Sequence, residues 1–200
     1  MQDTRQDYYY LDNAYFDGGR GRLFRVGHNA LQASGTERPD WARFAALGLG
    51  IQPWTKAGRH VLVCPQSDAY LRHVAGWPGG QAGWLDAVRA QLAAATTRPI
   101  VVRAWSRDKA GAAGGLGAAL QDCWALVTHA SAAANEALVA GVPVFCTGPC
   151  AARVMGETDL ARIDTPARPV GRLEWAAALA GQQWTLDELA DGTAWKALHG

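Results

Sequence analysis

Three side chains suited to binding or proton transfer lie close together near the middle of the chain. His129 and Ser131 follow the short apolar run 125–128, and Glu136 lies five residues further on. A hydroxyl and the first backbone N–H groups of a helix form a favourable environment for an anion, because the helix dipole is positive there. A neutral imidazole can accept a proton near neutral pH. The stretch therefore predicts a phosphate-binding site with a catalytic histidine, His129, beside it.

A strand, a helix and a second strand must position these side chains. The apolar run is typical of a strand buried on both faces. The alanine-rich segment that follows favours a helix, with Ser131 as its N-cap and Gly141 directly after its end. We expect Glu136 to lie beyond the first helical turn. Residues 142–145 then form the next strand, which delivers Thr147 to its carboxyl end.

Two earlier segments read as strands of the same sheet. Residues 60–64 and 99–103 are apolar, and apolar residues recur at helical spacing through 83–94 between them. Alternating strands and helices predict an α/β fold with a parallel, Rossmann-like sheet. Ligands of such sheets bind at the carboxyl ends of the strands. The candidate ligand-binding residues at these ends are Gln66, Ser67, Arg103, Lys109, His129, Ser131, Glu136 and Thr147.

A second polar cluster lies near the N-terminus. Segments 8–11 and 23–26 read as two strands joined by a glycine-rich turn, and Asp12 follows the first of them. The cluster contains Asp12, Arg20, Arg22, Arg25, His28 and Asn29. A carboxylate could accept the proton of an acceptor hydroxyl while cations hold its phosphates. The simpler alternative is an ordinary hairpin in which Asp12 caps a turn.

The central stretch resembles a known family. Thr128-His129, a run of small residues, and then Glu136-Ala-Leu-Val-Ala-Gly-Val-Pro-Val are similar to the donor-binding half of GT-B-fold nucleotide-sugar glycosyltransferases, above all the capsule-polysaccharide and UDP-glycosyltransferase branches. The resemblance implies that His129, Ser131 and the helix start hold a diphosphate and that Glu136 binds ribose hydroxyls. It also implies C-terminal helices that pack back on the sheet.

The chain departs from that family's pattern at three points. The spacing from His129 to Glu136 is about one residue shorter than in the plant-type signature, and alanines replace the usual glycines after the histidine. Arg103 matches an arginine of the capsule-type enzymes, but the Pro-His-Pro element that follows it there is absent. The chain as a whole also resembles a phage-encoded family near DNA-modification genes. That resemblance implies a hydroxymethylated pyrimidine in DNA as the acceptor.

The resemblance and the pattern together predict three segments. Residues 1–58 form a reduced N-terminal unit on the acceptor side, 59–165 form the Rossmann-like donor-binding domain, and 166–200 form the C-terminal helices. A chain of 200 residues suits one domain, or one domain with a small appendage.

Composition limits the partners. With 19 basic and 18 acidic residues, the net charge of +1 gives no bulk attraction to nucleic acid or to an anionic membrane. We expect a cytoplasmic protein, because no apolar run approaches a membrane span and the first residues are too polar for a signal peptide. The four cysteines read as reduced structural thiols rather than a disulfide scaffold or a metal site.

The leading hypothesis is therefore a glycosyltransferase that uses a nucleoside-diphosphate sugar as co-substrate. No metal or other cofactor is expected, since no Asp-x-Asp element lies near a strand end. Two alternatives stay open at this point. One is a nucleotide- or nucleic-acid-binding module without catalysis, and the other is an epimerase of nucleotide sugars.

Overall fold

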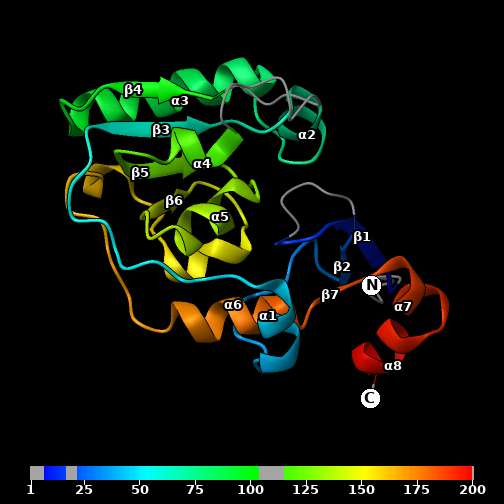
Figure 1. Ribbon diagram of the computed structural model, residues 1–200. Coiled ribbons are helices and arrows are strands. Elements are labelled where there is room, and N and C mark those ends of the chain that lie inside the picture. The colour runs from blue at the N-terminus through cyan, green and yellow to red at the C-terminus, as the bar shows by residue number, and fades with distance from the viewer. Residues whose placement is uncertain (1–6, 17–21, 104–114, 200) are drawn as a thin grey trace. The chain divides into compact units, whose positions relative to one another are not determined.

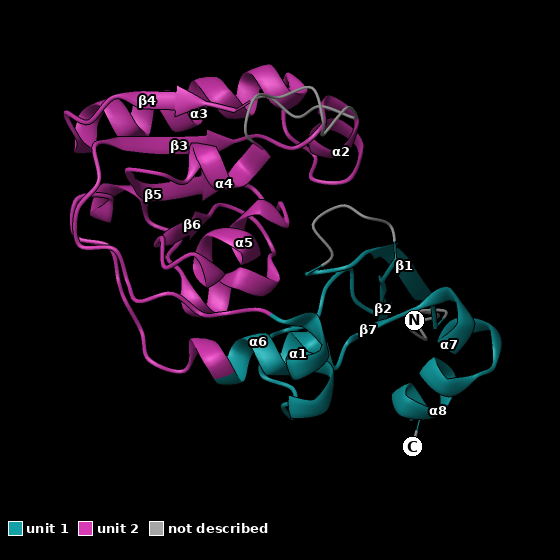
Figure 2. Cartoon of the chain, in the orientation of Figure 1, with its two compact units in different colours: residues 1–48, 174–200 teal, residues 49–173 magenta. Residues whose placement is uncertain are grey.

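The computed structural model describes residues 7–16, 22–103 and 115–199. Two compact units make up the chain: Met1–Gly48 with Glu174–Gly200, and Leu49–Leu173 (Figure 2). The division expected from the sequence places the two ends of the chain in separate segments, whereas the structure joins them. The reason is a short strand near the C-terminus that pairs with the N-terminal hairpin.

The larger unit contains the predicted parallel sheet. Its strand order is β4-β3-β5-β6, and all neighbouring strands run parallel (Figure 1). The strands are β3 (His60–Cys64), β4 (Ile100–Val102), β5 (Cys123–Thr128) and β6 (Val144–Cys146). The predicted α/β fold class with a Rossmann-like sheet is confirmed. Since all four strands share one direction, their carboxyl ends meet at one edge.

Helix α3 (Gly80–Ala95) covers one face of this sheet and closes its core. Trp84, Val88 and Leu92 recur at helical spacing and are almost fully buried. They pack with alternate residues of β3 and β5, among them Val63 and Val127. The predicted crossover helix between two parallel strands is therefore present, and it fixes β3 and β4 as neighbours.

Shorter helices fill the other connections. They are α2 (Asp68–His73), α4 (Gly115–Ala119), α5 (Ala133–Val139), η1 (Ala151–Met155) and η2 (Leu160–Arg162). The helix predicted over 151–155 is a 3₁₀ helix rather than an α-helix. Helix α2 was not predicted from the sequence. Among the described residues, no helix has both the length and the apolar character needed to cross a bilayer.

The smaller unit is built on a three-stranded antiparallel sheet in the order β1-β2-β7. Strand β1 (Tyr9–Asn13) pairs with β2 (Phe24–His28), so the predicted hairpin is confirmed. Asp12 lies inside β1 and not beyond its end, because the strand runs two residues further than predicted. Strand β7 (Gln183–Trp184) was expected to belong to the helical tail, and it is instead the third strand.

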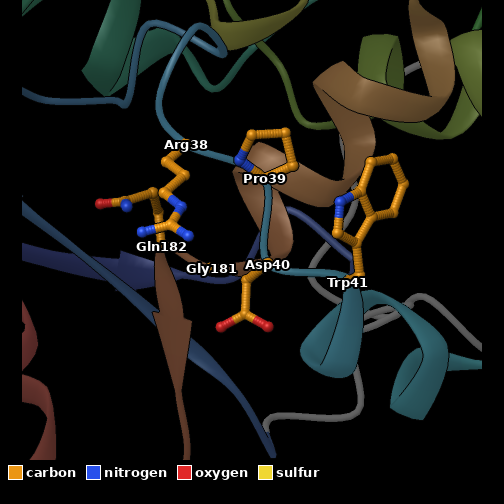
Figure 3. A pocket seen from close by; sticks show the side chains of 6 residues that line it. All are labelled: Arg38, Pro39, Asp40, Trp41, Gly181 and Gln182. Carbon is orange, nitrogen blue, oxygen red and sulfur yellow. The ribbon is translucent and has the colours of Figure 1, made fainter.

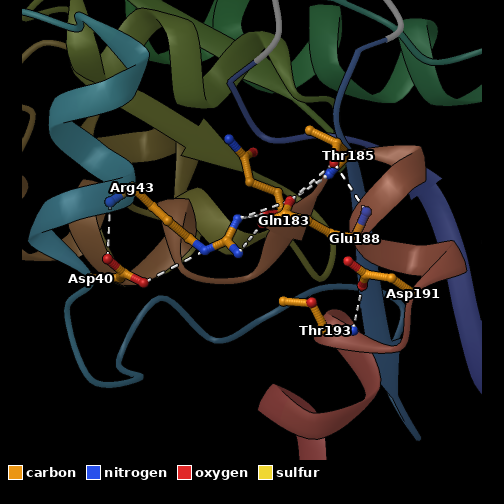
Figure 4. A network of polar contacts seen from close by, with 7 residues as sticks. All are labelled: Asp40, Arg43, Gln183, Thr185, Glu188, Asp191 and Thr193. Carbon is orange, nitrogen blue, oxygen red and sulfur yellow. Dashed lines mark hydrogen bonds and ion pairs between the residues drawn. The ribbon is translucent and has the colours of Figure 1, made fainter.

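Four helices accompany this sheet: α1 (Trp41–Leu47), most of α6 (Arg172–Ala180), α7 (Leu186–Ala190) and α8 (Thr193–His199). The predicted capping box is confirmed: Thr185 and Glu188 exchange both of its hydrogen bonds at the start of α7. Arg43 of α1 contacts Glu188 and donates to the Gln183 carbonyl at 3.1 Å, which ties α1 to β7 (Figure 4). Trp195, expected to pack inside, is half exposed.

Candidate functional site

The carboxyl ends of β5 and β6 bring two predicted site residues into contact. The Nδ1 atom of His129 lies 3.1 Å from the Thr147 hydroxyl oxygen, which also accepts a hydrogen bond from the Trp84 indole at 2.9 Å. Because an indole only donates, the Thr147 hydroxyl hydrogen is available to His129 Nδ1. When the hydroxyl donates to Nδ1, the imidazole carries its proton on Nε2. Trp84 therefore orients the histidine through Thr147.

His129 is largely enclosed, with an exposed fraction of 6 %. Its ring centroid lies 6.3 Å from those of Tyr70 and Trp77. A side chain at Gly148 would collide with the imidazole, because an added Cβ would lie 2.3 Å from Nε2. Burial lowers the pKa of His129, so the ring is neutral at pH 7. A neutral, oriented imidazole suits proton transfer better than it suits direct charge pairing with a phosphate.

Polar atoms also shape the turn after β5. The Thr128 hydroxyl donates to the Cys64 carbonyl at 2.6 Å and so joins the ends of β5 and β3. The Gln66 side-chain oxygen accepts from the Ala130 N–H at 3.0 Å, and Gln81 donates to the Gln66 carbonyl at 2.6 Å. Gln66 thus lies at the predicted edge, where it supports the turn that carries His129.

The helix after this turn begins later than predicted. Ala132 is the N-cap of α5, and its backbone is already helical, so Ser131 lies one position before the cap. The Ser131 hydroxyl accepts from the Ala133 N–H at 3.3 Å, which still satisfies one amide of the first turn. Because the helix starts at Ala133, Glu136 belongs to its first turn, contrary to expectation. Its side chain is exposed.

Arg103 and Ser67 also lie at this edge. The Arg103 N–H donates to the Val63 carbonyl at 2.9 Å, which continues the β4 pairing by one residue. Burial raises the pKa of the Cys64 thiol to about 12, while the nearby charges of Arg103 and Glu136 act on it in opposite directions. Both charges are therefore close to the end of β3. The Ser67 hydroxyl caps α2 by accepting from the Tyr70 N–H at 3.3 Å. Lys109 lies outside the described residues.

The predicted acceptor-side residues belong to the smaller unit. Asp12 and Arg25 are directly opposite each other in the β1–β2 register and form an ion pair of 2.6 Å. His28 stacks on Tyr9 with ring centroids 4.8 Å apart, and Asn29 has a left-handed backbone with φ of 54°. Arg22 is exposed, and Arg20 lies outside the described residues. The hairpin thus gives Asp12 a structural partner, Arg25.

Trp84 and Asn135 lie near the site and were not predicted from the sequence as site residues. Trp84 read as a core residue, and nothing in its spacing shows that its N–H reaches Thr147. Asn135 of α5 is 1 % exposed, and both polar atoms of its amide lack a partner among the described residues. A signal existed for Asn135, since it is a polar residue on the buried side of an alanine-rich helix.

A separate hollow of about 350 Å³ lies in the smaller unit (Figure 3). It is lined by Arg38, Pro39, Asp40, Trp41, Gly181 and Gln182, none of which was predicted as a site residue. Within the described parts of the chain, no three His, Cys, Asp or Glu side chains are grouped as metal ligands would be.

Comparisons with known proteins bear on the fold. No family model and no curated protein matches the chain. Among solved structures it is similar to KpsC of Thermosulfurimonas dismutans, a β-Kdo 2,7 transferase, with a TM-score of 0.55 and 13 % sequence identity. The match covers 96 % of this chain and 77 % of that one. At this identity the likeness shows a shared fold.

Proposed function

We propose that this chain is a glycosyltransferase that moves a sugar from a nucleoside-diphosphate sugar to an acceptor hydroxyl. One observation supports it most: His129, Thr147 and Gln66 meet at the carboxyl edge of a parallel sheet, in a fold shared with a β-Kdo 2,7 transferase. Since one fold serves many activities, the edge and its chemistry are the stronger part of the argument.

The hydrogen bonds of the edge indicate which groups would hold the donor phosphates. The Ala130 N–H is already used by Gln66, and the Ser131 N–H lies 3.4 Å from the Thr128 hydroxyl. The turn therefore offers few N–H groups to the donor phosphates. Helix α5 adds little, because it is only seven residues long. The cation of Arg103 then becomes the main partner for the departing diphosphate, with Lys109 as the predicted second cation.

The proposed acceptor side is the Asp12 hairpin, with a hydroxymethylated pyrimidine in DNA as the specific acceptor. Such a base would have to be flipped out of the duplex to reach an active site. A net charge of +1 gives no long-range attraction to DNA, so contacts would be local, through residues such as Arg22. Short saccharides are the alternative acceptor to test.

Release of free nucleoside diphosphate tests this function. The protein is incubated with a panel of nucleotide sugars, with and without hydroxymethylated duplex DNA or an oligosaccharide acceptor. Acceptor-dependent release supports a transferase. Isomerised nucleotide sugar without an acceptor would instead indicate an epimerase, and donor binding without any turnover would indicate a binding module.

Asp12→Asn tests the acceptor side. The change keeps the shape of the side chain and removes the base, so turnover should fall about 10²- to 10⁴-fold while donor affinity is retained. Asp86→Asn is the matched control, because Asp86 is an exposed acid on α3 in the other unit. Full activity of Asp12→Asn would reduce Asp12 to the structural partner of Arg25, and a melting curve shows whether the fold survives loss of that pair.

A further inference from the structure

Two of the four cysteines lie at the ends of a short segment at the carboxyl edge of the parallel sheet. Cys146 is the last residue of β6, and Cys150 directly precedes η1, with three residues between them. Their thiols are hydrogen-bonded to each other. The Cys150 sulfur also lies 4.0 Å from the Ser131 carbonyl oxygen. Because both thiols are free and already in contact, only a local adjustment of the backbone is needed to join them in a disulfide.

The two thiols differ in their access to solvent. Cys146 is fully buried, whereas Cys150 is partly exposed. The hydrogen bond to Cys150 and, after it, burial raise the pKa of the Cys146 thiol well above its usual value. Cys146 therefore stays protonated and out of reach of solutes at neutral pH. An exposed thiol that reacts first and an enclosed thiol beside it are the two groups that thiol–disulfide exchange requires.

The segment between the two cysteines holds the candidate catalytic histidine. Its first residue, Thr147, places its hydroxyl oxygen 3.1 Å from His129 Nδ1. Its second residue, Gly148, donates its N–H to the His129 carbonyl at 2.9 Å and leaves the space that the imidazole occupies. Any movement of this segment therefore changes the position of the His129 ring.

We propose that Cys146 and Cys150 form a reversible disulfide that weakens donor binding at this edge. Joining the sulfurs draws the ends of the segment together, and that displaces Thr147 and Gly148 from the positions in which they hold His129. The proposal deepens the proposed function, on which its effect on the donor rests, by adding redox control to the same site.

The oxidant is a small-molecule disulfide such as oxidised glutathione. The Cys150 thiolate attacks one of its sulfurs, the S–S bond of the oxidant breaks, and one small thiolate leaves. Cys146 gives its proton to that thiolate, attacks Cys150 Sγ and displaces the second small thiolate, which takes a proton from water. The two protein thiols lose two electrons and two protons, and the oxidant becomes two small thiols. A reducing thiol reverses both steps.

Counting free thiols after exposure to oxidised glutathione tests the chemistry. The full-length protein is incubated in glutathione buffers of increasing oxidised fraction, denatured, labelled with an alkylating reagent and weighed by mass spectrometry. The number of labels should fall from four to two, with Cys64 and Cys123 still labelled, and dithiothreitol should restore all four. A lasting glutathione adduct on Cys150, or four free thiols throughout, would overturn the proposal.

NMR of the same samples tests the effect on the site without any ligand. Oxidation should shift the His129 ring signals and the Trp84 indole N–H signal, because both groups are bonded to Thr147. The signals of Arg59 and Asp122, at the opposite edge of the sheet, should not move. A disulfide that leaves the His129 and Trp84 signals unchanged would contradict control of the site.

Cys150→Ser is the decisive variant. It removes the exposed thiol and keeps a hydroxyl that can donate to the Ser131 carbonyl. Oxidised glutathione should weaken nucleotide-sugar binding at least tenfold in the wild type and leave the variant unchanged. Cys123→Ser is the matched control, because a hydroxyl there can still donate to the Ala125 carbonyl, which the thiol reaches at 3.3 Å. It should respond as the wild type does. Equal loss of binding in Cys150→Ser would show that another group is oxidised.

Failure of this proposal is separable from failure of the proposed function. Nucleotide-sugar binding and turnover that oxidised glutathione does not change would retain the transferase and reject the redox control. A Cys146–Cys150 disulfide that shifts the His129 signals, in a protein that binds no nucleotide sugar, would retain the disulfide and reject the transferase.

Discussion

At the scale of single residues, the candidate site depends on the position of the His129 ring, which occupies space that a side chain at Gly148 would fill. The His129 ring lies so close to Gly148 that an added Cβ would be 2.3 Å from Nε2 and 2.4 Å from Cε1. On the other side, Thr147 and Trp84 hold the ring through a chain of two hydrogen bonds. Position 148 therefore controls where the imidazole lies.

Gly148→Ala should displace the His129 ring and break its bond to Thr147. We expect a loss of about 1–3 kcal/mol in the free energy of unfolding, as for other overpacked sites. Donor affinity should fall at least about tenfold, or about 1.4 kcal/mol. The control is Gly117→Ala in α4, where an added Cβ meets nothing within 4 Å. Denaturant unfolding and donor titration measure both quantities, and unchanged values for Gly148→Ala would show that the ring position does not matter.

Glu136 is the second residue for which a structural role and a ligand-binding role can be told apart by experiment. It is an exposed carboxylate in the first turn of α5, so helix-dipole stabilisation alone could account for it. If it accepts hydrogen bonds from a ribose or sugar diol, Glu136→Gln should cost about 1.5–3 kcal/mol of donor affinity. Calorimetric titration distinguishes the two roles. Glu174→Gln, an acid in the first turn of α6, is the matched control and should bind normally.

At the scale of elements, the end of α5 is fixed by the segment before β3. Gln52 N–H donates to the Val139 carbonyl and Thr55 N–H to the Gly141 carbonyl, each at 2.8 Å. Arg172 adds bonds to the Leu138 and Gln52 carbonyls. These contacts seat α5 against β5 and β6, and so they position the turn that carries His129.

Gly141→Ala, at the end of α5, should destabilise the protein strongly. Gly141 has a φ of 80°, and an added Cβ would lie 2.0 Å from the Pro53 carbonyl oxygen. The backbone strain costs about 1–3 kcal/mol, and the clash adds about 1–3 kcal/mol. Gly48→Ala separates the two, because Gly48 has a φ of 63° and open space around it. If both variants lose equal stability in urea unfolding, the contact with the Pro53 carbonyl contributes nothing to the loss.

The same helix shows how far the sequence could predict the structure. The apolar run before His129 predicted β5, because a strand buried on both faces consists of apolar residues. Gly141 predicted the end of α5, because a backbone with positive φ favours glycine. The start of α5 was displaced by one residue, since a run of alanines fits the last turn of a loop as readily as the first turn of a helix. Strand β7 is two residues long and exists through its pairing with β2, a long-range contact with no local signal.

The same limit applied to the candidate site. His129 and Thr147 could be placed together, because both follow strands that end at one edge. The sequence could not predict the hydrogen bond from Trp84 or the unpaired amide of Asn135, since each depends on packing between distant segments. The ion pair of Asp12 with Arg25 required the hairpin register, which the strand lengths predicted from the sequence did not fix.

At the scale of the whole molecule, the chain combines a parallel sheet with a polar edge and a small antiparallel unit built from both ends of the chain. We propose that the nucleotide sugar binds at the edge of the parallel sheet and the acceptor at the small unit. The likeness to a β-Kdo 2,7 transferase covers 96 % of the chain and so includes both units. The central claim is that the donor binds at the carboxyl ends of the parallel strands β3, β4, β5 and β6.

Backbone and side-chain NMR during a nucleotide-sugar titration tests that claim most directly. A binding nucleotide sugar, identified by thermal shift, should move the signals of Gln66, Ala130 and Thr147 together with the His129 ring. Signals at the opposite edge of the sheet, such as those of Arg59 and Asp122, should stay unchanged and serve as the internal control. Shifts confined to that opposite edge, or no response to any nucleotide sugar, would contradict the account.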